Sequence, residues 1–135
     1  MARDPLAALA KLRGLEVLEA RVATALRGAA LDAAEADAAA AESELKAEDP
    51  LAAPLTYGSY LERGLAARHQ ARALVAGHAE ALETERQRLA LARSAERLVE
   101  LLRERRAEAA RRLAARREQA RLDEAAARGE RRREE

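Results

Sequence analysis

The sequence predicts an all-α protein in which two long helices form an antiparallel coiled-coil hairpin, the second helix being longer and overhanging the first. Along residues 60–135, which contain no proline, leucine and valine recur mostly at multiples of three or four positions. A similar pattern runs from Leu6 to Leu45. Residues 49–59, between the two patterns, hold two prolines and a glycine. A break of about ten residues between two amphipathic helices is typical of a helical hairpin.

The first helix is expected over residues 5–48. Asp4 can accept a hydrogen bond from a backbone N–H of the first turn, and Pro5 at the first helical position needs no donor. Gly14 and Gly28 each cost about 1 kcal/mol relative to alanine inside a helix. They mark either the close approach of another backbone or a helix strong enough to tolerate them. The side chains expected to face the second helix are Leu6, Leu9, Leu12, Leu15, Leu18, Val22 and Leu26.

The tip of the hairpin is expected at residues 49–59, and the second helix at residues 60–127. Ser59 and Glu62 have the spacing of a capping box, in which the two side chains bond backbone N–H groups at the start of a helix. The remaining residues, 128–135, are expected to fray because they include a glycine. The apolar seam of the second helix is expected to contain Leu61, Leu65, Leu74, Val75, Leu82, Leu89, Leu98, Leu102, Leu113 and Leu122.

The unequal lengths of the two helices leave part of the second one without a partner in the chain. If the turn is centred near Ala53, Leu6 lies beside about Glu100. The overhang is then expected over residues 101–127. Its apolar stripe is expected to be formed by Leu102, Leu113 and Leu122. An apolar stripe that nothing in the chain covers implies a second molecule or a fold-back of the chain.

The composition favours a thin seam between helices over a thick core. The 135 residues include no Cys, Trp or Phe and only two Tyr, and most of the 49% hydrophobic residues are alanine. The absence of cysteine excludes disulfides, thiol catalysis and Cys-ligated metal. A formal net charge of +1 gives no overall field toward nucleic acid or membrane. No signal peptide or membrane span is expected, because the longest uncharged stretch covers only residues 50–61.

The sequence shows no catalytic or metal-binding constellation, so we expect a protein that is not an enzyme and needs no cofactor. His69 and His78 are nine residues apart, which places them on opposite sides of a helix, where they cannot share a metal ion. There is no glycine-rich phosphate loop and no serine nucleophile elbow. The carboxylates lie among arginines on exposed helix faces, and a two-helix rod offers no concave site.

Two regions of opposite sign and an uncharged tip are candidate binding surfaces. Residues 32–49 hold seven acids and one lysine, whereas residues 103–135 hold twelve arginines and eight acids. The arginines leave open a nucleic-acid-binding helix, although the aromatic residues that stack on bases are missing. Tyr57 and Tyr60, with Leu61, either bind a partner or plug the end of the hairpin.

Near the C-terminus, residues 117–128 have the sequence REQARLDEAAAR. This segment resembles the closing signature of the FliJ/YscO family, R-x-E-Q-x-x-L-D-E-x-A-x-x-R. The match begins near Arg117 and ends at Arg128, and the letters LRERR at residues 102–106 are similar to the family's L-x-E-R-R step. Residues 60–61, after the break, resemble the family's tip segment. The resemblance covers nearly the whole chain. The signature often closes on an aromatic residue, whereas Gly129 follows it here.

The resemblance implies a small cytoplasmic component of a flagellar or virulence type III export apparatus, peripheral to the inner membrane and similar to the stalk of rotary ATPases. In this family the end that carries both termini sits in a hexameric export ATPase, and the hairpin approaches the cytoplasmic domain of the export gate. Some members also escort export chaperones. The candidate ATPase-binding residues are Leu102, Leu113, Glu118, Gln119, Leu122, Asp123, Glu124 and Arg128. The candidate gate-binding residues are Tyr57, Tyr60 and Leu61.

We therefore expect a non-enzymatic stalk that couples the ATPase to the gate in protein transport, without binding nucleic acid and without direct membrane insertion. A self-associating coiled-coil scaffold, in which two overhangs pair, is the first alternative. A basic helix that binds nucleic acid is the second, and its affinity would fall steeply with salt concentration.

Overall fold

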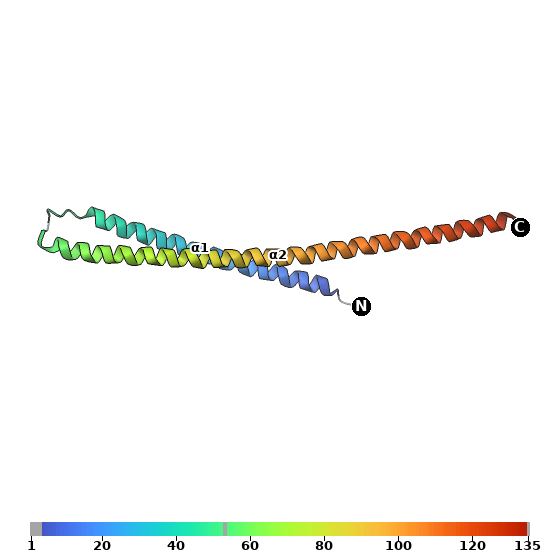
Figure 1. Cartoon of the computed structure of the whole chain (residues 1–135), viewed down its shortest axis with the longest axis horizontal. Helices are drawn as coiled ribbons and strands as arrows, with labels where there is room; N and C mark the ends of the chain where they lie inside the picture. Colours follow the sequence, from blue (N-terminus) through green and yellow to red (C-terminus); the bar gives the residue numbers. More distant parts are fainter. Residues whose placement is uncertain (1–3, 53, 135) are drawn as a thin grey trace.

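Two long helices make up almost all of the described chain. The computed structural model describes residues 4–52 and 54–134, and within them α1 spans Pro5–Ala47 and α2 spans Pro54–Glu134. The helices run antiparallel, and α2 continues alone far beyond the N-terminal end of α1 (Figure 1). The predicted all-α hairpin with a longer second helix is confirmed.

Local sequence sets the start of α1 and the turn that follows it. Asp4 Oδ1 accepts a hydrogen bond of 3.0 Å from the Leu6 N–H, and Pro5 occupies the first helical position as predicted. After α1 ends, Asp49 Oδ1 accepts a hydrogen bond of 2.9 Å from the Leu51 N–H. This local turn helps to reverse the chain in a tip that is shorter than the predicted one.

The second helix begins earlier and ends later than the sequence indicated. It starts at Pro54, so Ser59 lies inside the helix instead of capping it at the expected start. Proline suits the first helical position because the N–H group that it lacks would have no partner there, and this signal prevails over the capping box. At the other end the helix passes through Gly129 and reaches Glu134, because the surrounding Ala, Glu and Arg residues have high helix propensity. The expected frayed tail is therefore helical as far as the structure describes it.

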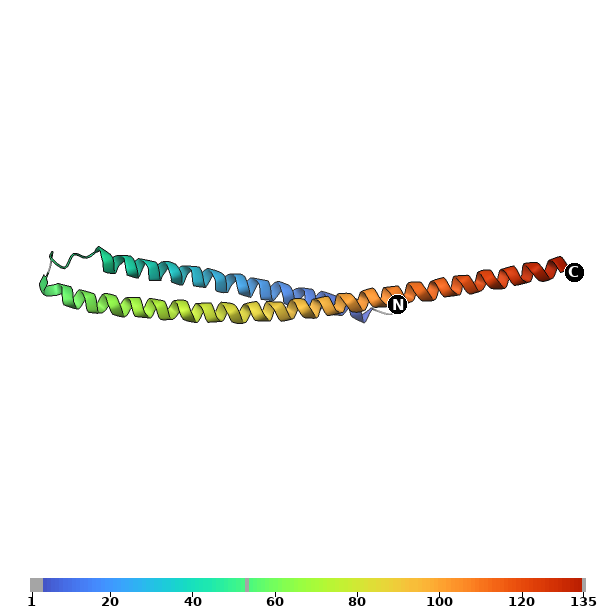
Figure 2. The same ribbon diagram turned by 45° about the horizontal axis from the view of Figure 1, so that its top comes forward.

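The register of the hairpin is shifted by about one helical turn from the expectation. A Cβ atom built on Gly14 would lie 3.8 Å from Glu96 Oε1. Eight residues before Gly14 is Leu6, and eight residues after Glu96 is Glu104, so the same register places Leu6 opposite Glu104. The expected partner of Leu6 was Glu100, four residues earlier in α2. The overhang therefore comprises residues 105–134 and spans about 45 Å at 1.5 Å per residue. Figure 2 shows α2 continuing as a single helix on this side.

The contact face of α2 follows a seven-residue repeat. The residues at its two seam positions are all buried or half-buried. The first position holds Leu61, Arg68, Val75, Leu82, Leu89 and Glu96, and the second holds Gly64, Ala71, His78, Glu85, Ala92 and Val99. An average spacing of 3.5 residues is that of a left-handed coiled coil. Half of the positions hold charged or small residues, so the seam is thin.

The face of α1 that packs against α2 is not the predicted leucine stripe. Most of that stripe lies on the outer side, where the exposed side chains are Leu12, Leu15, Leu18, Val22 and Leu26. The inner side instead buries Val17 and Ala20, each 4% exposed. α1 is apolar on two sides. The inner side carries leucines along its whole length, at Leu6, Leu31 and Leu45, whereas the outer stripe has no leucine after Leu26, so the inner side can bury apolar surface against more of α2.

The predicted seam of α2 is correct at some positions and wrong at others. Leu61, Val75, Leu82 and Leu89 lie in the seam as expected. Four other leucines of the predicted seam that precede the overhang are 41–63% exposed, namely Leu65, Leu74, Leu98 and Leu102. A strict seven-residue repeat excludes them, because steps of three or four residues can drift around the helix when they are not alternated.

Three helical glycines provide a test of the packing. A Cβ atom at Gly28 or Gly77 would meet no atom within 4 Å, whereas at Gly64 it would lie 2.6 Å from Leu45 Cδ2. We expect Gly28→Ala and Gly77→Ala each to raise the free energy of unfolding by about 0.5–1 kcal/mol through helix propensity. Gly64→Ala should gain less or lose stability, because Leu45 must move. Denaturation followed by circular dichroism would compare them, and an equal gain at all three positions would contradict the close contact at Gly64.

Candidate functional site

The overhang is free of any partner helix within the described residues (Figure 2). Leu113 is 49% exposed and Leu122 is 57% exposed. The other described residues of the segment are also exposed, apart from the half-buried Glu108. Seven of the eight candidate ATPase-binding residues lie on the overhang, and Leu102 lies at its base with 49% of its surface exposed. All eight side chains are therefore accessible to a partner.

The leucines of this region lie on two sides of the helix instead of forming one stripe. Leu113 follows Leu102 by eleven residues, which returns it to nearly the same side at about 100° per residue. Leu122 follows nine residues later and so lies on the opposite side. The predicted single stripe is therefore wrong. A partner that contacts only one side of the overhang would leave part of this apolar surface in water.

The polar candidates pair with each other or with neighbours along the same helix. Gln119 Nε2 donates a hydrogen bond of 2.8 Å to Asp123 Oδ1. Ion pairs join Glu118 to Arg121 and Glu124 to Arg128. Each such pair stabilises an isolated helix by about 0.2–0.5 kcal/mol. Together they support an extended helix that has no partner to pack against.

Near the start of the overhang, Glu108 forms short hydrogen bonds with two arginine side chains. Its carboxylate accepts hydrogen bonds of 2.8 Å from Arg111 and 2.9 Å from Arg112. These bonds, with the charge of Arg111 adding to them, lower the pKa of Glu108 below its ordinary value. Because the pKa is lower in the folded state, the stabilisation is present above the ordinary pKa and is lost as the pH falls through the lowered value.

We expect an NMR titration of the Glu108 side-chain carboxyl carbon to show this lowered pKa. The double substitution Arg111→Ala and Arg112→Ala should raise the pKa toward the ordinary glutamate value, because both hydrogen bonds to the ionised form are removed. A pKa that stays unchanged in the double variant would contradict the assigned cause.

At the tip, all three candidate gate-binding residues are half-buried and help to close the hairpin. The Tyr60 hydroxyl donates a hydrogen bond to the Glu44 carbonyl oxygen of α1, and its ring centroid lies 6.4 Å from that of Tyr57. Leu61 occupies the first position of the seam. Desolvation, with the charges of Glu48 and Glu44 adding to it, raises the pKa of the Tyr60 hydroxyl, which therefore stays a donor at neutral pH. These contacts favour the interpretation of Tyr60 and Leu61 as a plug.

The most exposed apolar side chains of the tip were not among the candidates. Leu51 is 87% exposed and Leu55 is 98% exposed. They lie on either side of the chain reversal, Leu55 in the first turn of α2. The sequence did carry a signal for them, because both leucines belong to the uncharged stretch around Pro50 and Pro54.

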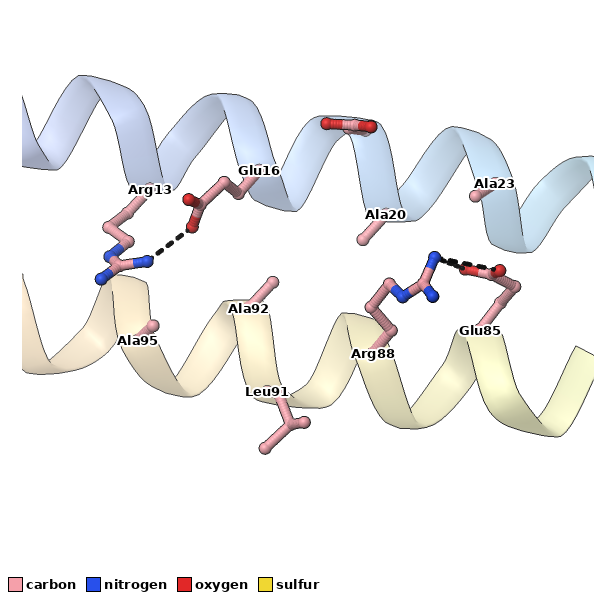
Figure 3. A pocket seen from close by; sticks show the side chains of 10 residues that line it. Arg13, Glu16, Ala20, Ala23, Glu85, Arg88, Leu91, Ala92 and Ala95 are labelled. Atoms are coloured by element: carbon pink, nitrogen blue, oxygen red, sulfur yellow. Dashed lines mark hydrogen bonds and ion pairs between the residues drawn. The ribbon is translucent and has the colours of Figure 1, made fainter.

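A groove runs between the helices in the paired part of the molecule (Figure 3). Its volume is about 430 Å³, and small side chains such as Ala20 and Ala92 point into the gap. Ion pairs along each helix flank it, Arg13 with Glu16 and Glu85 with Arg88. The groove exists because alanines at facing positions do not fill the space between the helices.

The two histidines do not come together. His69 is exposed, whereas His78 is half-buried in the seam. Among residues 4–52 and 54–134, no three Asp, Glu or His side chains are arranged to hold a metal ion. None of the described helices has a stretch apolar and long enough to cross a membrane.

The family of the chain follows from a comparison with known proteins. The family model described as the flagellar FliJ protein matches residues 5–135, which is nearly the whole sequence. The chain belongs to the FliJ family. Comparisons with curated proteins and with solved structures found no match.

Membership of the FliJ family makes the chain a component of the flagellar export apparatus. It confirms the resemblance found in the sequence and favours the flagellar system over the virulence system, between which the motifs did not decide. The residues that resemble the family's closing signature lie on the overhang of this FliJ-family hairpin, and those that resemble its tip segment lie in the first turns of α2.

Proposed function

We propose that this FliJ-family chain is the non-enzymatic stalk of the flagellar export ATPase. The overhang enters the centre of the hexameric ring, and the tip of the hairpin contacts the cytoplasmic domain of the export gate. The observation that carries the proposal is the overhang itself, a helix of about 45 Å with no partner in the described chain. The stalk is then cytoplasmic and lies beneath the membrane-bound part of the apparatus.

The distribution of leucines on the overhang suits a surrounding partner. Because Leu113 and Leu122 lie on opposite sides of the helix, both become buried only when protein surrounds the rod. Residues 105–134 also contain eleven arginines and six acids. We therefore expect the inner surface of the ring to combine apolar contacts with acidic side chains or carbonyl oxygens.

The mechanism we propose is allosteric coupling by an asymmetric rod. A single helix inside a six-fold ring presents different side chains to different subunits. Subunits that contact Leu113 and subunits that contact Leu122 therefore experience different interaction free energies. Such differences shift each subunit between its conformational states, as any coupling between binding and turnover requires.

At the opposite end, Leu51 and Leu55 are the side chains that we assign to the gate, together with the half-buried Tyr57. Exposed leucines on a short tip are suited to insertion into an apolar pocket of a partner. Tyr60 and Leu61 act indirectly in this proposal, because they fix the tip against the end of α1.

The experiment that tests the stalk is ATP turnover by the export ATPase of the same organism, with and without this chain. A version that ends at Glu104 keeps the paired helices and lacks the overhang, so it is the matched control. We expect stimulation by the full chain and none by the shorter one. Equal effects of both versions, or no effect and no co-purification with the full chain, would refute the proposal.

The scaffold alternative, in which two overhangs pair, receives less support from the structure. A two-stranded coiled coil needs its apolar residues on one side of each helix. Leu113 and Leu122 do not share a side, so pairing of two overhangs would bury one leucine and leave the other in water.

A further inference from the structure

The outer face of α1, on the side away from α2, is apolar and uncovered in the described structure. Leu12, Leu15, Val22 and Leu26 lie on it and are 51–66% exposed. Their successive spacings of three, seven and four residues fit a second seven-residue coiled-coil repeat, in which Glu19 occupies the remaining position. α1 therefore carries two seams, of which α2 fills only one.

The second seam extends well beyond these leucines. From residue 8 to residue 47, the other positions of the repeat are all alanine or serine, and every position of the repeat is exposed. Glu19 is the one charged residue in it. A helix face turned permanently to water usually carries many charged residues. This outer face instead has the composition of a contact surface that allows close approach of another helix.

We propose that a second copy of this chain covers the outer face of α1, the two α1 helices packing antiparallel in a symmetric dimer. A parallel pairing would place Glu19 next to Glu19 of the second copy inside the seam, where like charges repel. An antiparallel pairing replaces this direct contact by a diagonal one, because Glu19 then faces Val22 of the second copy and the two Glu19 residues lie in neighbouring layers, about 4.5 Å apart along the helices. It also satisfies the requirement that each surface in a two-fold dimer be complementary to itself.

One antiparallel register matches both the leucines and the charges. It sets Leu15 against Leu26 of the second copy, and Glu19 against Val22 of the second copy, at facing seam positions. Lys11, which flanks the seam, then lies beside Asp32 of the second copy, and symmetry repeats the pair at the other end. Lys11 and Asp32 are exposed and form no ion pair within the described chain. This charge complementarity favours a second copy over an unrelated helix.

The dimer leaves the outer part of each overhang free, because in this register Ala47 of the second copy reaches only to the level of about residue 116 of α2. Because the two α1 helices run in opposite directions, the overhangs extend toward opposite ends of the assembly. The proposal therefore does not depend on the ATPase contact, and each can fail while the other stands.

Sedimentation equilibrium of the full chain tests the proposal. We expect a mass of twice the 14.7 kDa of one chain, and a monomer when Leu15→Glu and Leu26→Glu are combined. Both leucines are exposed in the single chain, so the variant should keep its hairpin. The control Leu91→Glu, at a residue of α2 that is 73% exposed, should remain dimeric. A wild-type chain that stays monomeric up to about 100 µM, a concentration corresponding to weak association, would overturn the proposal. So would a dimer that survives in the double variant.

Two further sets of variants test the register. The chain has no cysteine, so Leu15→Cys with Leu26→Cys should form a disulfide between copies on mild oxidation. Leu15→Cys alone should not, because the two copies of this residue would be about 16 Å apart along the helices. Lys11→Asp should weaken the dimer roughly tenfold, and adding Asp32→Lys should restore it. Cross-linking by Leu15→Cys alone, or no restoration by the second charge change, would overturn the antiparallel register.

Discussion

Combining Leu113→Asp with Leu122→Asp is expected to abolish binding of the chain to the export ATPase while the hairpin stays helical. Burial of a leucine side chain contributes about 1.5–3 kcal/mol, so each substitution should weaken binding by roughly 10- to 100-fold. The desolvation of an unpaired aspartate adds to the loss. Because the two leucines lie on opposite sides of the helix, each single variant should lose affinity, and calorimetric titration would measure both.

The control for this pair is Leu91→Asp, which makes the same chemical change at a residue that is 73% exposed but lies in the paired part of α2. It should bind the ATPase like the wild type, and circular dichroism should show similar helix content in all variants. If the double variant binds with wild-type affinity, the overhang does not contact the ATPase. A loss confined to one of the single variants would instead indicate a partner on one side of the rod.

The second large effect is expected at Leu82, which is 7% exposed and lies in the middle of the seam. Leu82→Asp removes one of the few buried side chains and places a charge between the helices. We expect a loss of about 3 kcal/mol or more in the free energy of unfolding. For a hairpin with so few buried residues, such a loss should separate the helices at ambient temperature.

Urea denaturation followed by circular dichroism would measure this change, again with Leu91→Asp as the matched control. The control should alter the unfolding midpoint only slightly, because its side chain is mostly in water. Similar losses in the two variants would mean that the seam is not where the structure places it.

The elements that depend on short-range chemistry were predictable from the sequence. Asp4 and Pro5 define the start of α1, and the prolines near the tip indicate the chain reversal, because both signals act through adjacent backbone groups. The start of α2 was less certain, since Pro54 and Ser59 are both acceptable helix starts and only one can be used. When two local signals have similar strength, the sequence alone does not show which of them determines the start of the helix.

The choice of contact face was not predictable in the same way. α1 has apolar residues on two sides, and only pairing with the seven-residue repeat of α2 shows that Val17 and Ala20 face inward while Leu15 and Leu26 face outward. For the candidate site, sequence position alone placed the signature residues on the overhang. The division of Leu113 and Leu122 between two sides was also present in their spacing, since nine residues correspond to two and a half turns at 3.6 residues per turn.

A seam with so few buried side chains also makes the reach of the rod adjustable. Each turn of α1 contributes only one or two side chains to the contact with α2, so unzipping of its first two turns gives up chiefly the half-buried Leu6 and Leu9. Release of the segment that contains Leu6 and Leu9 would free a further two turns of α2, about 10 Å of helix. The depth to which the rod can enter a socket is then governed by a local equilibrium in α1, and not solely by the fixed length of α2.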